Sequence, residues 1–230
     1  MYYRIIATGS KGNSVQINEL LIDCGISFNR LKEHLYTVKW ILITHSHTDH
    51  CNIATLKRIR KLFPKIQIYA NVEVAQVLLG QGIEIESILN PGALSQIGPY
   101  QIMPFLCPHD VLCTGFSVSY EDVDREDVDF IYATDTTTLS HAPDKKYDYF
   151  FIEGNYCEQI LAKALGDSLY VSGSFRHLSI QKMKLFFYTH RKTKEARLIQ
   201  LHCSNRFGYL VFKQDAVYTS EASFPQLPES

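Results

Sequence analysis

Short apolar stretches alternate with turn residues through most of the chain and predict many strands. Before residue 70, such stretches lie at residues 3–7, 14–17, 20–22, 41–44 and 66–69. Later stretches lie at residues 130–133, 149–152 and 196–201, and turn residues divide residues 83–120 into a further series of short runs. Runs of this length that are bounded by Gly, Pro and Asn are typical of strands. The chain is therefore predicted to be rich in β structure.

Apolar residues at helical spacing predict helices between these strands. Residues 28–34 and 72–79 show the pattern, and it is clearest at residues 53–63, where Ile53, Leu56 and Ile59 share one face before Pro64. Two more helices are expected near residues 158–165 and 179–188. Mixed strands with interspersed helices indicate an α/β (α+β) fold, in which sheets pack face to face and helices lie outside.

Composition favours a single domain. The 230 residues are 46% hydrophobic and 20% charged, with no repeat and no low-complexity linker. We expect one domain over residues 1–220 and a frayed tail over residues 221–230, which are rich in Ser and Pro. No apolar run approaches the roughly 20 residues that span a bilayer, and residues 1–6 resemble a strand more than a signal peptide. A cytoplasmic protein with free cysteines and no membrane partner is expected.

Charge is balanced overall but uneven along the chain. The formal net charge of −1 argues against a general binder of polyanions. Residues 57–61 and 182–197 are nevertheless basic, whereas residues 121–129 are acidic. Each basic run could meet phosphates locally, or could simply be the solvated surface of a helix.

A polar cluster directly follows the apolar run at residues 40–43. It contains His45, His47, Asp49 and His50. Imidazole nitrogen and carboxylate oxygen suit Zn²⁺, Mn²⁺ or Fe, whereas Ca²⁺ and Mg²⁺ prefer oxygen ligands alone. Residues i and i+2 of a strand point the same way, so His45 and His47 are expected to share one metal ion. Asp49 and His50 lie beyond the bend and would face a second ion.

Four further polar residues stand at the ends of predicted strands, namely Asp23, His109, Asp135 and His202. Any one of them could be an ordinary polar strand end with satisfied hydrogen bonds. Together, beside the histidine cluster, they predict a metal site at one edge of the sheets.

In order along the chain, Asp23, the HxHxDH run of residues 45–50, His109, Asp135 and His202 resemble the five motifs of the metallo-β-lactamase superfamily. The resemblance implies an αββα sandwich with a dinuclear site, usually holding two Zn²⁺ ions, with Mn²⁺ as an alternative. It implies a first metal held by His45, His47 and His109, and a second held by Asp49, His50 and His202. Asp135 would bridge the two ions, and Asp23 would support the site through hydrogen bonds.

The bridging position carries Asp135, where the β-lactamases of the superfamily use Cys. This difference favours the phosphoesterase or thioester-hydrolase branches. The glycine-containing run of residues 7–14, together with residues 21–27, is similar to the YycJ (WalJ) group, whose members act on phosphodiesters. This similarity implies that Ser10, Lys11 and Asn13 border the substrate, although a simple hairpin turn would also explain the run.

Glu153 and His177 are similar to a Glu/His pair of tRNA 3′-processing enzymes. In that family the histidine contacts a non-bridging oxygen or protonates the leaving alkoxide, and the carboxylate orients the histidine. A departing alkoxide is strongly basic, so a positioned acid helps it to leave.

These features predict a dinuclear-metal-dependent hydrolase of phosphodiester bonds in nucleic acid or nucleotides, most simply a YycJ-like nuclease. A metal-bridging hydroxide would attack phosphorus, Asp49 could also accept a proton, and His177 would assist the leaving group. Three alternatives stay open: a cyclic-nucleotide phosphodiesterase, which the near-zero net charge favours, a glyoxalase-type thioester hydrolase, and a non-catalytic binding protein. A homodimer is expected by analogy alone.

Overall fold

The structure is a computed structural model that describes residues 1–121, 127–164, 171 and 173–211. The predicted tail at residues 221–230 lies outside these residues, as does residue 165 of a predicted helix. The extent of the domain over residues 1–220 therefore stays a prediction.

The first of two sheets contains six strands from the N-terminal part of the chain. They are β1 (Tyr3–Ala7), β2 (Ser14–Ile17), β3 (Leu20–Ile22), β4 (Trp40–Ile43), β5 (Gln67–Ala70) and β6 (Ser87–Ile88). β1, β2 and β3 pair antiparallel, and the pairs from β3 to β6 are parallel. In this register Ile22 lies beside Leu42, which in turn lies beside Tyr69.

The second sheet also contains six strands, in the order β12-β11-β10-β9-β8-β7. They are β7 (Ser95–Ile97), β8 (Tyr100–Cys107), β9 (Cys113–Tyr120), β10 (Val128–Ala133), β11 (Tyr149–Glu153) and β12 (Arg197–Leu201). β7 to β10 pair antiparallel, whereas β10, β11 and β12 are parallel to one another.

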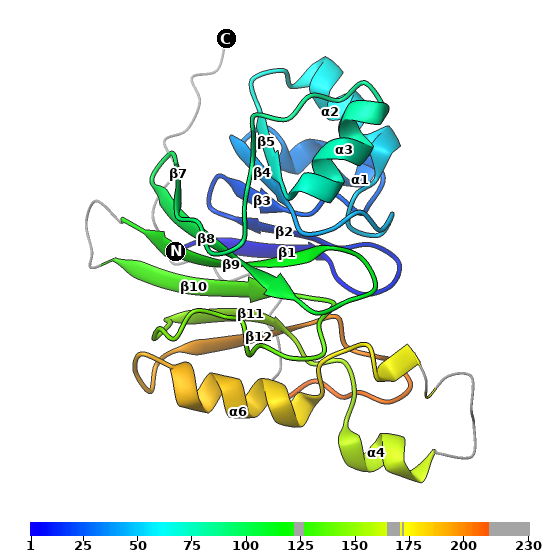
Figure 1. Ribbon diagram of the computed structural model, residues 1–230, viewed down its shortest axis with the longest axis vertical. Helices are drawn as coiled ribbons and strands as arrows, with labels where there is room; N and C mark the ends of the chain where they lie inside the picture. The colour runs from blue at the N-terminus through cyan, green and yellow to red at the C-terminus, as the bar shows by residue number, and fades with distance from the viewer. Residues whose placement is uncertain (122–126, 165–170, 172, 212–230) are drawn as a thin grey trace.

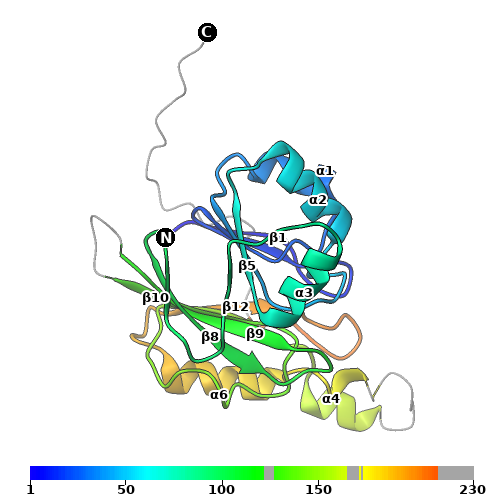
Figure 2. The same ribbon diagram turned by 45° about the horizontal axis from the view of Figure 1, so that its top comes forward.

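Helices cover the outer faces of both sheets, as Figures 1 and 2 show. α1 (Phe28–Leu31), the 3₁₀ helix η1 (Lys32–His34), α2 (Ile53–Leu62) and α3 (Val72–Gly80) lie on the first sheet. α6 (Ile180–His190) packs on the second sheet, and α4 (Glu158–Lys163) projects from its end. The layers therefore form the predicted αββα sandwich. Among the described residues, no helix has the length and apolar character that a membrane crossing requires.

Three apolar layers stabilise the sandwich. Side chains such as Ile17, Leu42, Phe116 and Phe151 fill the space between the two sheets. A second layer lies under α1, α2 and α3, and a third lies under α6. Each fully buried aliphatic or aromatic side chain contributes about 1.5–3 kcal/mol. Asn52, Asn71 and Ser179 begin α2, α3 and α6, because the side-chain oxygen of each accepts a hydrogen bond from a backbone N–H three residues later.

The parallel strands end at one edge of the sandwich, and polar residues follow them there. Asp23 follows β3, Asp135 lies just beyond β10, and His202 follows β12. All three have backbone φ values between 50° and 63°, in the left-handed region that non-glycine residues rarely adopt. Such strained conformations are concentrated at functional sites, because surrounding contacts must hold them in place. This edge is therefore the place to look for the site.

Candidate metal centre

The first group of candidate ligands contains His45, His47 and His109. One nitrogen from each ring lies within 4.8 Å of the others. One residue, Thr44, separates His45 from the end of the buried strand β4, and one residue, Pro108, separates His109 from the end of β8. The centroid of the His109 ring lies 5.3 Å from that of His45 and 5.2 Å from that of His47. The structure thus brings together two parts of the chain that are about sixty residues apart in the sequence.

The second group contains Asp49, His50 and His202, again with ligand atoms within 4.8 Å of one another. Asp135 lies between the two groups, because it also forms a group with His45 and His50. Its Oδ2 atom is 2.8 Å from Nε2 of His50, and its Oδ1 atom is 3.6 Å from Nε2 of His202. This is the position that a bridging carboxylate would need.

Metal ions fit this arrangement. Nε2 of His45, Nδ1 of His109 and Nε2 of His202 are buried and have no hydrogen-bond partner. A buried polar atom without a partner costs about 1–3 kcal/mol. Three such nitrogens in one cluster, beside the carboxylate of Asp135, are therefore suited to divalent ions that accept nitrogen and oxygen ligands.

Asp23 fixes the orientation of the His50 ring, and Thr44 in turn fixes Asp23. Oδ2 of Asp23 lies 2.7 Å from Nδ1 of His50, and both side chains are fully buried. The backbone N–H of Thr44 donates to Oδ1 of Asp23 at 2.9 Å, and the Thr44 hydroxyl donates to the same oxygen at 3.0 Å. Because Nδ1 of His50 is engaged with Asp23, Nε2 is left to face Asp135. A carboxylate behind a histidine in this way fixes the orientation of a metal ligand.

The protonation of the cluster depends on these contacts. Burial alone would lower the pKa of His50, but the carboxylates of Asp23 and Asp135 raise it to about 10. Burial and the neighbouring His50 lower the pKa of His45 to about 2. Although burial opposes ionisation of Asp135, its bond to His50 and the charge of His202 hold the pKa of that carboxyl below its usual range. At neutral pH His45 is thus neutral and Asp135 ionised, as metal ligands must be, whereas His50 carries a proton that a bound cation would have to displace.

Glu153 and His177 form a pair beside the second group. Oε1 of Glu153 lies 2.6 Å from Nδ1 of His177 and 3.2 Å from Nδ1 of His202. Its other oxygen accepts hydrogen bonds from the backbone N–H groups of Thr136 and Leu178. Burial disfavours the charged form of Glu153, yet the bonds to both histidines lower its pKa. The same carboxylate outweighs burial and raises the pKa of His177.

Comparison with known proteins agrees with this geometry. A family model described as the beta-lactamase superfamily domain matches residues 18–202. The chain belongs to the metallo-β-lactamase superfamily. The predicted superfamily and sandwich fold are thereby confirmed, and membership implies divalent metal ions in the site.

Solved structures of the superfamily share the fold at low sequence identity. Human tRNase Z, short form, is 19% identical, and the match covers 90% of this chain and 93% of that chain with a TM-score of 0.63. YhfI from Bacillus subtilis is 18% identical, with coverages of 90% and 88% and a TM-score of 0.61. A diphosphatase from the PhnP family is 16% identical, with the same coverages and TM-score. No curated protein sequence was found to match the chain.

The loop of residues 9–13 lies beside the metal centre, but its residues differ in their exposure to solvent. Ser10 and Lys11 are exposed, whereas Asn13 is buried. The Asn13 amide bonds to both backbone groups of Gly9, and its Nδ2 atom lies 2.8 Å from Nε2 of His50. These contacts do not test whether Asn13 borders the substrate, which stays a prediction. They show that its side chain fixes the loop against the metal centre, because every polar atom of the amide has a partner inside the protein.

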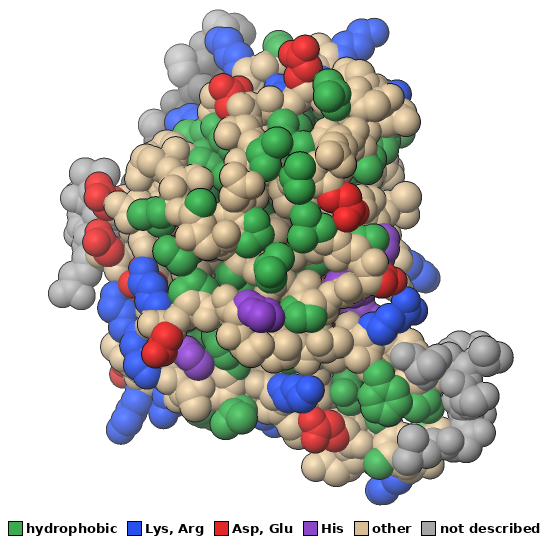
Figure 3. Space-filling model, in the orientation of Figure 1, with side chains coloured by type: hydrophobic (Ala, Val, Ile, Leu, Met, Phe, Trp, Pro, Cys, Tyr) green, Lys and Arg blue, Asp and Glu red, His purple; other side chains and the backbone are tan. Residues whose placement is uncertain are grey.

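Two residues at the rim were missed by sequence reasoning. Oδ1 of Asp110 lies 3.0 Å from Nε2 of His109 and 3.5 Å from Nε2 of His47. Nη1 of Arg176 donates to Oδ2 of Asp110 at 2.9 Å. Each of them directly neighbours a predicted site residue in the sequence, His109 or His177. This adjacency was the signal that could have pointed to them. On the face shown in Figure 3, histidine side chains reach the surface with acidic and basic side chains beside them.

The basic run of residues 57–61 serves local structure in the outer helical layer. Arg60 donates to the backbone oxygens of Glu84 and Ile66, and Arg58 lies over the ring of Phe28. All six cysteines are free, as expected. Of these, Cys113 lies near the centre, with Sγ 3.6 Å from Nδ1 of His45.

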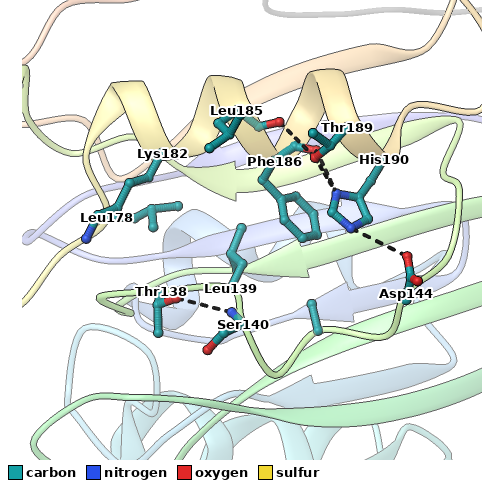
Figure 4. Close-up of a pocket in the computed structure, with 11 residues that line it drawn as sticks. Thr138, Leu139, Ser140, Asp144, Leu178, Lys182, Leu185, Phe186, Thr189 and His190 are labelled. Atoms are coloured by element: carbon teal, nitrogen blue, oxygen red, sulfur yellow. Dashed lines mark hydrogen bonds and ion pairs between the residues drawn. The ribbon is translucent and has the colours of Figure 1, made fainter.

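A cavity of about 640 Å³ lies between α6 and the segment after residue 137, apart from the metal centre (Figure 4). Leu139, Leu178 and Phe186 line its middle, with Lys182 toward one end and His190 toward the other. None of the predicted site residues lines this cavity. Its surface is mostly apolar, so we assign it no part in the chemistry.

Proposed function

We propose that the protein is a divalent-metal-dependent hydrolase that cleaves phosphodiester bonds in nucleic acid or nucleotides, with a YycJ-like nuclease activity. The observation that carries the proposal is the Glu153–His177 pair, with its 2.6 Å contact, beside Asp135 and His202. A thioester substrate releases a weakly basic thiolate, which needs little help from a general acid. A phosphodiester releases a basic alkoxide, for which a positioned histidine is suited.

The first ion would be held by His45, His47 and His109, and the second by Asp49, His50 and His202, with Asp135 between them. Zn²⁺ suits this set of nitrogen and oxygen donors, and Mn²⁺ is the alternative. Two bound ions would supply Lewis acidity toward the phosphate and would make an attacking water more acidic.

His177 is held so that one ring nitrogen is available to a leaving oxygen. Its Nδ1 is engaged by Glu153, which remains ionised, and the raised pKa of His177 favours the protonated ring. The proton would pass from the other ring nitrogen to the departing alkoxide. Asp49, which is partly exposed beside His50, is the candidate to accept the proton of the nucleophile.

A cyclic-nucleotide phosphodiesterase is the second candidate. The net charge of −1 favours it, because proteins that bind duplex DNA usually carry a clear basic excess. The exposed Ser10 and Lys11 in the YycJ-like loop favour the nuclease. A cytoplasmic location and a homodimer complete the proposal.

The direct experiment incubates metal-loaded protein with end-labelled single-stranded and double-stranded DNA, RNA and a panel of cyclic nucleotides. Progressive loss of the DNA label supports the nuclease, and ring opening alone supports the signalling phosphodiesterase. The Asp135→Ala variant should be inactive on every substrate. If the metal-bound protein turns over none of these compounds, the phosphodiester proposal is wrong.

A further inference from the structure

Arg176 lies at the rim of the metal centre and has no part in the chemistry proposed above. It directly precedes His177, and the two backbone N–H groups donate to the oxygens of Gly173 and Ser174 in one tight turn. Its Nη1 atom is bonded to Asp110, whose other oxygen lies 3.0 Å from Nε2 of His109. Arg176 therefore connects the segment of the leaving-group histidine to the segment of a candidate metal ligand.

The Arg176–Asp110 ion pair is easily exchanged. The Arg176 side chain is 61% exposed and that of Asp110 is 41% exposed. Surface ion pairs of this kind contribute only about 0–1 kcal/mol. The contact with Asp110 uses Nη1 alone, so the other guanidinium donors can face a ligand. A guanidinium held by one carboxylate in this way is oriented but still able to bind an anion.

We propose that Arg176 binds the phosphate next to the scissile one, on the leaving-group side of a linear substrate, and that Asp110 orients it for this contact. The inference rests on the proposed function, because the position of His177 defines the leaving-group side. The planar guanidinium matches phosphate oxygens in a bidentate manner, which a lysine cannot reproduce.

A second cation borders the centre from another segment. Lys11 is exposed in the loop whose Asn13 N–H donates to the backbone oxygen of Asp49 at 2.7 Å. Lys11 thus lies two residues from Asn13, which contacts the segment of the second group of ligands, whereas Arg176 is connected through Asp110 to His109 of the first group. A cyclic mononucleotide has one phosphate and cannot use both cations in addition to the metal centre. The two cations therefore favour a linear substrate.

Phe175 adds an exposed aromatic side chain to the same turn. It directly precedes Arg176, and its side chain is 58% exposed. An aromatic ring beside a phosphate-binding cation is the usual combination for single-stranded nucleic acid, because an unpaired base can stack on the ring. A single-stranded oligonucleotide is therefore the appropriate probe.

The first test measures binding of a fluorescent, single-stranded phosphorothioate oligonucleotide, which resists hydrolysis, to the metal-loaded full chain at several salt concentrations. Each phosphate contact with a single strand contributes about 0.7 to the slope of log K against log salt. Arg176→Gln should therefore make the slope less steep by about 0.7 and weaken binding about tenfold. Arg176→Lys should keep the slope but bind more weakly than the wild type.

Arg58→Gln is the matched control, because it removes the same charge from α2, where Arg58 lies over Phe28. Its salt slope should equal that of the wild type. If Arg176→Gln leaves the slope unchanged, or if the wild type does not bind the oligonucleotide, the inference is wrong.

The second test compares two substrates in turnover. Bis(p-nitrophenyl) phosphate has a single phosphate, so Arg176→Gln should change its kcat/KM by less than about twofold, whereas KM for a cleavable oligonucleotide should rise about tenfold. An equal loss on both substrates would overturn the inference. If the wild type cleaves neither substrate, the proposed function fails, and the binding experiment still decides the role of Arg176.

Discussion

The carboxylate of Asp23 lies 2.7 Å from Nδ1 of His50, and neither side chain is exposed to solvent. This contact decides which nitrogen of His50 faces the other candidate ligands. Both oxygens of Asp23 are used, because Oδ1 accepts hydrogen bonds from the backbone N–H and hydroxyl of Thr44. Asparagine, the uncharged isostere of aspartate, would therefore have to place its NH₂ group against a hydrogen-bond donor, either on Thr44 or on His50.

Asp23→Asn should lower the affinity for the second metal ion by about 10- to 100-fold, since the amide would turn a donor toward either Thr44 or His50. Titration of the metal against a coloured chelator measures this change directly. Asp144→Asn is the control, because that carboxylate is fully exposed beside α6. An unchanged metal affinity of Asp23→Asn would show that the contact does not orient a ligand.

His177→Ala should lower kcat for an oligonucleotide by about 10²- to 10⁴-fold, because the leaving alkoxide loses its proton donor. The loss should be much smaller for bis(p-nitrophenyl) phosphate, whose nitrophenolate leaves without protonation. Steady-state rates on both substrates measure the difference. His190→Ala, at the far end of α6, serves as the control and should change neither rate. Equal losses of His177→Ala on the two substrates would argue against an acid role.

Asn13→Ala should destabilise the protein by about 1–3 kcal/mol, because the backbone groups of Gly9 and the backbone oxygen of Asp49 lose their buried amide partner. Lys11→Ala, two residues away in the same loop, should leave the free energy of unfolding unchanged and weaken only substrate binding. Urea denaturation followed by fluorescence measures both variants. Equal stability of the two would mean that Asn13 does not anchor the loop.

Local patterns in the sequence predicted the strands, most helices and the residues that end the parallel strands. Asp23, Asp135 and His202 could be found because each directly follows, or nearly follows, an apolar run. The predicted strand at residues 41–44 ends at Ile43 instead, because the N–H of Thr44 donates to Asp23 rather than to a neighbouring strand. The predicted helix at residues 28–34 splits into α1 and a 3₁₀ turn.

Contacts between distant segments could not be predicted in the same way. Asp110 and Arg176 are 66 positions apart, and nothing in the spacing of either residue indicates that they meet. The burial of Asn13 depends on the packing of its loop against Asp49 and His50, which a hairpin-like sequence does not reveal. The contacts of these residues could be recognised only once the fold had placed their three loops at one edge of the sandwich.

Gly25 lies where the backbone beside Asp49 comes closest to another segment. A Cβ atom at Gly25 would lie 1.6 Å from the backbone oxygen of Asp49 and 2.7 Å from the backbone nitrogen of His50. Backbone atoms cannot move aside as a flexible side chain can, so the segment that carries both candidate ligands must shift. Gly25→Ala should therefore lower the free energy of unfolding by about 3 kcal/mol, or roughly 6–12 °C in Tm, and should weaken metal binding as well.

Gly80→Ala provides the matched control, because a Cβ atom at this helical position would meet no heavy atom within 4 Å. Alanine is a better helix former than glycine, so this variant should be unchanged or more stable by up to about 1 kcal/mol. Thermal unfolding with and without added metal separates the two effects in Gly25→Ala. If the two alanine variants were equally stable and bound metal equally well, the close approach at Gly25 would not position Asp49 and His50.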